Sequence, residues 1–141
     1  MVNQNKFQIL QKECSNCIKC SLSLTRNNVV FGRGNPSSKL FVIGEGPGQQ
    51  EDEQGLAFVG RAGKMLDSAF LSVGIDTNED CYISNIVKCR PPNNRKPLAN
   101  EVIECMPWLN KQIQMVQPKV IVLAGSTAVQ SYLNIDEPIS K

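Results

Sequence analysis

The stretch from residue 40 to residue 52, LFVIGEGPGQQED, constrains the fold more than any other part of the chain. It opens as an apolar run rich in β-forming residues and stops at glycines and a proline. Open α/β sheets bind their ligands at the carboxyl ends of strands, so a buried strand that ends this way predicts a binding loop. Glycines permit close approaches that a Cβ would block. The loop then turns acidic at Glu51 and Asp52.

This loop has two plainer interpretations. One is an ordinary surface turn after a strand. The other is a loop that binds nucleotide phosphates, which the sequence disfavours. The G-x-G-x-G spacing lacks the third glycine of the dinucleotide fingerprint, and the acidic run would repel phosphate.

The rest of the chain alternates strand and helix patterns. The pattern predicts helical turns around residues 7–10, a short edge strand at 28–31 before a turn at 32–36, and strands at 39–43, 81–88 and 120–123. Helices are expected at 62–73, at 102–116 despite Pro107, and after Gly125. Three prolines make 89–97 irregular. This order predicts a parallel sheet with helices on both faces.

Composition limits the class of protein. The length of 141 residues suits one domain, and 41% hydrophobic and 20% charged residues are typical of a globular protein. No apolar run approaches the roughly 20 residues needed to span a bilayer, and the first residues lack the pattern of a secretory signal. We therefore expect a cytoplasmic protein without a membrane partner. The sequence contains no histidine, which excludes histidine-based triads and imidazole bases.

The six cysteines indicate a metal site rather than disulfides, which are rare in a reducing cytosol. Cys17 and Cys20 form a C-x-x-C pair, Cys89 follows a predicted strand, and Cys105 lies in a predicted helix. Four such thiolates could hold zinc or an iron–sulfur cluster, and spacing alone does not separate the two. The alternative is that Cys89 and Cys105 are merely buried apolar residues. Cys14 and Cys81 are then spare, although Cys14 could replace a member of the pair.

The loop between Cys89 and Cys105 is basic. It carries Arg90, Arg95 and Lys96, which would form a phosphate-contacting surface if a metal site ordered the loop. A solvated basic loop is the alternative. The net charge of +2 does not by itself indicate a nucleic-acid binder.

Several motifs in a fixed order resemble the family 4 uracil-DNA glycosylases, the iron–sulfur type. They are GEGPGQQED at 44–52, FVGRAG at 58–63 and SNIVKCRPP at 84–92, with NCxxC at 16–20, VFG at 30–32 and VLAG at 122–125. The similarity runs from about Cys17 to the last residue. The resemblance implies a three-layer α/β/α sandwich around a central parallel sheet. It also implies cleavage of the N-glycosidic bond of deoxyuridine in DNA, after the uracil has been flipped into a pocket.

The resemblance also implies roles for individual residues. Cys17, Cys20, Cys89 and Cys105 would hold a 4Fe-4S cluster, with zinc as the lesser alternative. Phe58 would stack on uracil, Asn85 would pair with its N3 and O4, and Glu51 with Asp52 would position or activate water. The backbone near uracil O2 would come from the glycine-rich loop, which supplies Glu45, Gly46 and Gly48.

One departure from the family stands out. Its members continue with a further strand and a histidine-proline motif, and this sequence contains neither. We therefore expect residues 1–141 to form a single domain truncated at its C-terminus, to which a second chain could supply the strand. The alternative function is a catalytically silent iron–sulfur module that binds DNA or a protein.

Overall fold

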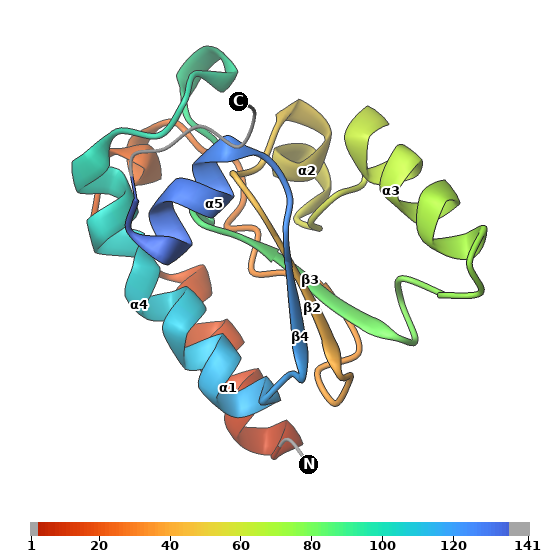
Figure 1. Cartoon of the computed structure of the whole chain (residues 1–141). Helices are drawn as coiled ribbons and strands as arrows, with labels where there is room; N and C mark the ends of the chain where they lie inside the picture. Colours follow the sequence, from red (N-terminus) through yellow and green to blue (C-terminus); the bar gives the residue numbers. More distant parts are fainter. Residues whose placement is uncertain (1–2, 136–141) are drawn as a thin grey trace.

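The computed structural model describes residues 3–135 and centres on a four-stranded sheet (Figure 1). The strands are β1 (Arg33–Gly34), β2 (Leu40–Gly44), β3 (Cys81–Asn85) and β4 (Val120–Leu123). Their order across the sheet is β1-β3-β2-β4. β2 runs parallel to both β3 and β4, whereas the short β1 pairs antiparallel with β3 at the edge. The predicted parallel sheet is thus confirmed, with one antiparallel edge strand added.

Helices lie on both sides of this sheet (Figure 1). One side carries α1 (Gln4–Ser15), α4 (Ala99–Val116) and α5 (Ser126–Leu133), and the other carries α2 (Gln49–Gln54) and α3 (Arg61–Leu71). Two short 3-10 turns, η1 (Ser21–Leu24) and η2 (Pro92–Asn94), complete the set. Pro107 lies inside α4, as expected.

The strand sequences explain this layering. Side chains alternate between the two faces of a strand. Phe41 and Ile43 therefore pack into the cluster beneath α1 and α4, whereas Val42 packs into the cluster that includes Leu66 and Phe70 of α3. A parallel strand covered on both faces has a continuous apolar run. The predicted α/β class is confirmed in this arrangement.

Three details differ from the predictions. Residues 28–31 do not form a ladder; Val30 N–H donates a single bond to the Lys88 carbonyl (2.7 Å), and the edge strand comes later, at β1. α2 was not predicted because its six residues, QQEDEQ, show no apolar period. In α3, Met65 is 69% exposed although the predicted apolar face included it, because the sheet is covered by Leu66 and Phe70 instead.

Two earlier expectations concern the chain as a whole. Within residues 3–135, none of the helices has the length and hydropathy that a membrane crossing requires. The expected site of a further strand lies after α5, and residues 136–141 are outside the described part of the chain.

Candidate functional site

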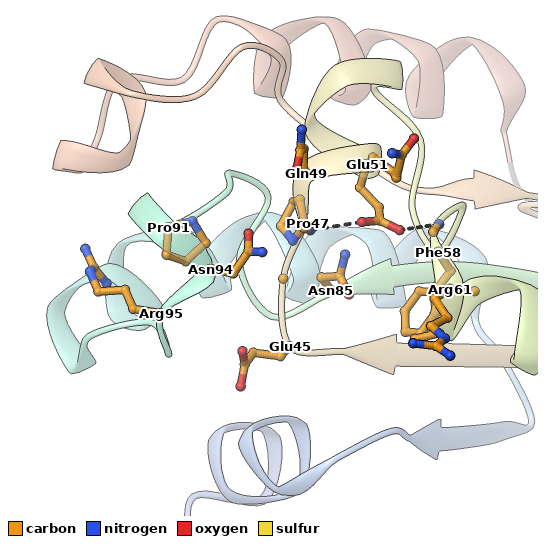
Figure 2. A pocket seen from close by; sticks show the side chains of 16 residues that line it. Glu45, Pro47, Gln49, Glu51, Phe58, Arg61, Asn85, Pro91, Asn94 and Arg95 are labelled. Carbon is orange, nitrogen blue, oxygen red and sulfur yellow. Dashed lines mark hydrogen bonds between the residues drawn. The ribbon is translucent and has the colours of Figure 1, made fainter.

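The ends of β2 and β3 build one side of a cavity of about 380 Å³. Gly44 and Asn85, the last residues of these strands, are paired in the register, so the loops that follow them start side by side. Figure 2 shows the side chains that line the cavity, which come from the loop after β2, from α2, from the turn before α3 and from the η2 loop. The lining residues that carry chemistry are Glu45, Glu51, Phe58, Arg61, Asn85 and Asn94.

The bare backbone of Gly44 lets an aromatic ring and an amide meet. A Cβ built on Gly44 would lie 2.4 Å from Phe58 Cζ and 2.7 Å from Asn85 Oδ1. Asn85 is only 2% exposed, because it ends a buried strand. The structure thus brings together Phe58 and Asn85, two of the residues predicted for base binding, in one cavity.

The Phe58 backbone is unusual. Its φ of 54° lies in the left-handed region, which costs a non-glycine residue about 1–3 kcal/mol. Gly63, in the first turn of α3, makes room for this turn, since a Cβ there would lie 1.8 Å from the Phe58 carbonyl oxygen. Strain of this kind persists only where the surroundings hold it in place.

Glu51 is held by the backbone. Its Oε1 accepts from Gly48 N–H (3.0 Å), and its Oε2 accepts from Val59 N–H (3.0 Å) and Gly60 N–H (2.7 Å). A carboxylate offers about four lone pairs, so three of them are occupied. Glu51 therefore ties the start of α2 to the turn that carries Phe58, while lining the cavity.

Asp52 does not reach the cavity. It is 1% exposed, and its oxygens accept from Asn27 N–H (2.9 Å), Asn27 Nδ2 (2.7 Å) and Asn28 N–H (3.2 Å). Those bonds fix α2 against the loop at 27–28. Asp52 therefore does not lie with Glu51 at the cavity, where the two carboxylates were predicted to position a water molecule together.

The glycine-rich loop supplies backbone to the cavity. Glu45, Gly46 and Gly48 all line it. A Cβ on Gly46 would lie 2.7 Å from Val87 Cγ2, so only glycine fits there without movement. The Glu45 carboxylate turns outward and accepts from Thr127 Oγ1 of α5 (2.5 Å).

The three basic residues predicted for DNA contact have separate surroundings. Arg95 lines the cavity, but its guanidinium is bound in a fork to Glu101, with both N···O distances 2.8 Å. Arg90 is bonded to Asn94 Oδ1 (2.6 Å). Lys96 is exposed and lies beside α4, away from this cavity.

Five cysteines line a second, smaller cavity. They are Cys14, Cys17, Cys20, Cys89 and Cys105, brought together from α1, the loop before η1, the loop after β3 and α4. Cys81 lies in the other core cluster, on the α3 side of the sheet. The predicted four thiols therefore share one cavity, with Cys14 beside them.

Nitrogen donors point at three of these sulfurs. Arg26 Nη1 donates to Cys89 Sγ (3.3 Å), the Lys88 backbone N–H donates to Cys105 Sγ (3.1 Å), and Trp108 Nε1 donates to Cys17 Sγ (3.3 Å). Such bonds favour the thiolate that a metal requires. Burial meanwhile raises the pKa of Cys89 to about 11 and also raises the pKa of Cys105, so metal loading would release protons.

A buried lysine of the cysteine cavity is bonded to a residue that lines the first cavity. Lys88 is 1% exposed, and its Nζ donates to Ser84 Oγ and to the Asn85 carbonyl, both at 2.7 Å. Burial lowers the pKa of the Lys88 ammonium to about 8. A cation in this position suits neighbouring thiolates, which would compensate its charge.

The sulfurs are not arranged for a single ion. Within residues 3–135, no three cysteine, aspartate or glutamate side chains lie close enough to hold one metal ion. Four cysteines from separate segments nevertheless line one cavity, and such a donor set could hold a metal cluster.

Sequence reasoning missed Arg26, Arg33, Lys88 and Trp108, which hold the predicted site residues in place. Arg26 and Arg33 lie in loops or short strands without an apolar period, so their sequence positions carry no signal of burial. Lys88 was predicted only as the last residue of a strand, whereas it lies three residues beyond the end of β3 and is 1% exposed.

Comparison with known proteins identifies relatives. A family model described as "Uracil DNA glycosylase superfamily" matches residues 31–140. The type-4 uracil-DNA glycosylase of Thermotoga maritima is 44% identical over 128 residues, covering 91% of this chain and 66% of that protein. The type-4 enzyme of Archaeoglobus fulgidus is 44% identical over 124 residues, covering 88% of this chain and 62% of that protein.

A more distant match lies inside a longer protein. The DNA polymerase of Bacillus phage SP01 is 31% identical over 99 residues, which cover 70% of this chain and 11% of that polymerase. The chain spans less than two thirds of the two type-4 relatives, 66% and 62% of their lengths.

Proposed function

Because the chain belongs to the uracil DNA glycosylase superfamily and is a homologue of type-4 enzymes, we propose that it removes uracil from DNA by hydrolysing the N-glycosidic bond of deoxyuridine. The observation that carries this proposal is the meeting of the Phe58 ring and the Asn85 amide over the bare backbone of Gly44.

The cavity has the parts that recognition of a flipped pyrimidine requires. An aromatic face can stack on the base, and a fixed amide can donate to O4 and accept from N3–H. Asn85 is buried and ends a paired strand, so its amide is held in place before any base enters. The cavity of about 380 Å³ lies within the usual range for small-molecule pockets.

The departing uracil carries negative charge on O2, and the glycine-rich loop would face it. We assign this role to the backbone of Glu45 and Gly46, with Gly48 shaping the turn, because uncovered N–H groups stabilise a developing oxyanion. Three of the four lone pairs of Glu51 are occupied by N–H donors, which leaves one to orient a water molecule. Asp52 contributes by fixing α2 rather than by touching water.

We assign a 4Fe-4S cluster to Cys17, Cys20, Cys89 and Cys105. In this fold the cluster would serve as a structural cross-link between the N-terminal segment, the loop after β3 and α4, and so would order the basic loop. That loop offers Arg90 and Lys96 to DNA phosphates. Arg95 is not assigned to this contact, because its guanidinium forms an ion pair with Glu101.

A uracil-containing oligonucleotide tests the activity. After incubation with the protein and treatment with alkali, strand breaks should appear at the uracil and not in a thymine control. Phe58→Ala should reduce cleavage, while Met65→Ala, a change at an exposed residue of α3, should not. The absence of cleavage at stoichiometric protein would refute the enzymatic proposal for this chain.

One observation favours a silent binding module as the second candidate. Glu51 is already engaged by three backbone donors. Such a module would bind uracil-containing DNA in a gel-shift assay without breaking it.

A further inference from the structure

We infer that Arg33 is the positioning residue that holds Phe58 ready to stack on a base, an inference that rests on the proposed function. Arg33 Nε donates to the Ala57 carbonyl (2.6 Å), and its Nη2 donates to the Phe58 carbonyl (2.9 Å). The guanidinium therefore binds the two consecutive carbonyls that bring the chain into the left-handed turn.

Two side chains of opposite charge hold this turn, one at its backbone N–H groups and the other at its backbone carbonyls. The Glu51 carboxylate takes the N–H groups of Val59 and Gly60, and the Arg33 guanidinium takes the carbonyls of Ala57 and Phe58. Charge-assisted hydrogen bonds are stronger than neutral ones. Together they offset the cost of a positive φ at Phe58.

Arg33 is itself fixed. Its backbone belongs to β1 and is paired with Ile83 of β3, the strand that ends at Asn85. Its Nη2 forms an ion pair with Asp67 of α3 (2.9 Å), and its Nη1 donates to Asn78 Oδ1 (2.8 Å). The arginine side chain is only 9% exposed, so the contacts are shielded from water.

The consequence concerns how the two base-binding groups are aligned. Asn85 is positioned by β3, whereas Phe58 lies on a loop that no strand supports. Arg33 connects that loop to β3 through β1, so the Phe58 ring and the Asn85 amide are positioned by the same pair of strands. Catalytic groups act best when their supporting residues fix them in advance. Lysine cannot replace arginine here, because it lacks the planar fork.

A double-mutant cycle tests this inference. Single-turnover excision of uracil from a single-stranded oligonucleotide would be measured for the wild type, Arg33→Gln, Phe58→Ala and the double variant. We expect Arg33→Gln to slow excision about tenfold, the value of one charge-assisted hydrogen bond. In the Phe58→Ala background the same change should have almost no effect, because Arg33 acts through that ring. Additive losses would overturn the inference.

A second measurement does not depend on catalysis. Hydrogen exchange of the Val59 and Gly60 amides should become at least about tenfold faster in Arg33→Gln. Asn78→Ala is the matched control, because it removes one exposed bond to the same guanidinium while the Asp67 ion pair and both carbonyl contacts still hold Arg33 in place. It should leave exchange and excision unchanged. Unchanged exchange in Arg33→Gln would overturn the inference. If the exchange becomes faster in Arg33→Gln but the wild type neither binds nor cleaves uracil DNA, only the proposed function is refuted.

Discussion

At the scale of single residues, the base preference should depend on Asn85. An amide presents one donor and one acceptor to uracil, and a carboxyl group in its place would suit the exchanged pattern of cytosine. Asn85→Asp should therefore lower uracil excision by roughly ten- to a hundredfold and raise excision of cytosine. Oligonucleotides that differ only in that base would measure both rates. An unchanged ratio would show that Asn85 does not read the base.

Gly44 offers a test of the contact geometry. In Gly44→Ala the new methyl group would lie 2.4 Å from the Phe58 ring and 2.7 Å from the Asn85 amide, so one of them must move. Overpacking of this kind costs about 1–3 kcal/mol. We expect a lower midpoint of urea unfolding and slower excision. Gly74→Ala, where nothing lies within 4 Å of the added methyl, should leave excision unchanged.

At the scale of elements, the start of α4 depends on a buried carboxylate. Glu101 is 0% exposed and accepts from Arg95, from Leu98 N–H (2.9 Å) and from Ser21 Oγ (3.5 Å). The hydrogen bond from Arg95 holds the pKa of Glu101 below its ordinary value. A depressed carboxyl pKa contributes stability above the unfolded-state pKa, and that stability is lost as pH falls through the folded-state pKa.

Glu101→Gln should therefore destabilise the protein most at neutral pH. The difference in the free energy of unfolding between wild type and variant should shrink as the pH falls below the ordinary glutamate value of 4.5. Urea unfolding at pH 7 and pH 4 would measure it, with the exposed Glu13→Gln as the control. A difference that is constant with pH would show that the ion pair contributes nothing.

The elements also show what sequence reasoning can reach. Strands β2 and β4 and helices α4 and α5 follow from uninterrupted apolar runs and periods, and their layering follows from strand alternation. α2 has no apolar side chain that would predict it, and its first turn is capped by the bond from Gly48 N–H to Glu51 Oε1. The pocket residues could be named by resemblance, but the Arg33 grip on Phe58 joins residues 25 positions apart and has no local signal.

At the scale of the whole molecule, iron bound in the cysteine cavity should stabilise the folded protein. Anaerobically purified protein should contain about four irons per chain. Cys89→Ser should abolish iron binding and lower the thermal midpoint, because the free energy of cofactor binding becomes folding free energy. Cys81→Ser, on the other side of the sheet, should retain the iron. Zinc, or no metal, in the wild type would refute the cluster.

The salt dependence of DNA binding should distinguish the basic residues that contact phosphate from those that do not. Arg90→Ala and Lys96→Ala should each reduce the slope of log K against log salt by about one, as expected for a phosphate contact. Arg95 donates to Glu101, so Arg95→Ala should lower the unfolding midpoint and leave the slope unchanged. Fluorescence anisotropy with a labelled oligonucleotide at several salt concentrations would measure the slopes. An unchanged slope in Lys96→Ala would remove it from the DNA contact.

The position of Lys88 has a consequence for how the protein would respond to iron loss. Its backbone N–H donates to a cysteine sulfur while its ammonium donates to the carbonyl of Asn85. Removing the cluster would leave this buried ammonium without the anionic thiolates beside it. Since that ammonium also holds the backbone carbonyl of Asn85, iron starvation would be felt at the residue proposed to read the base, which lines the other cavity.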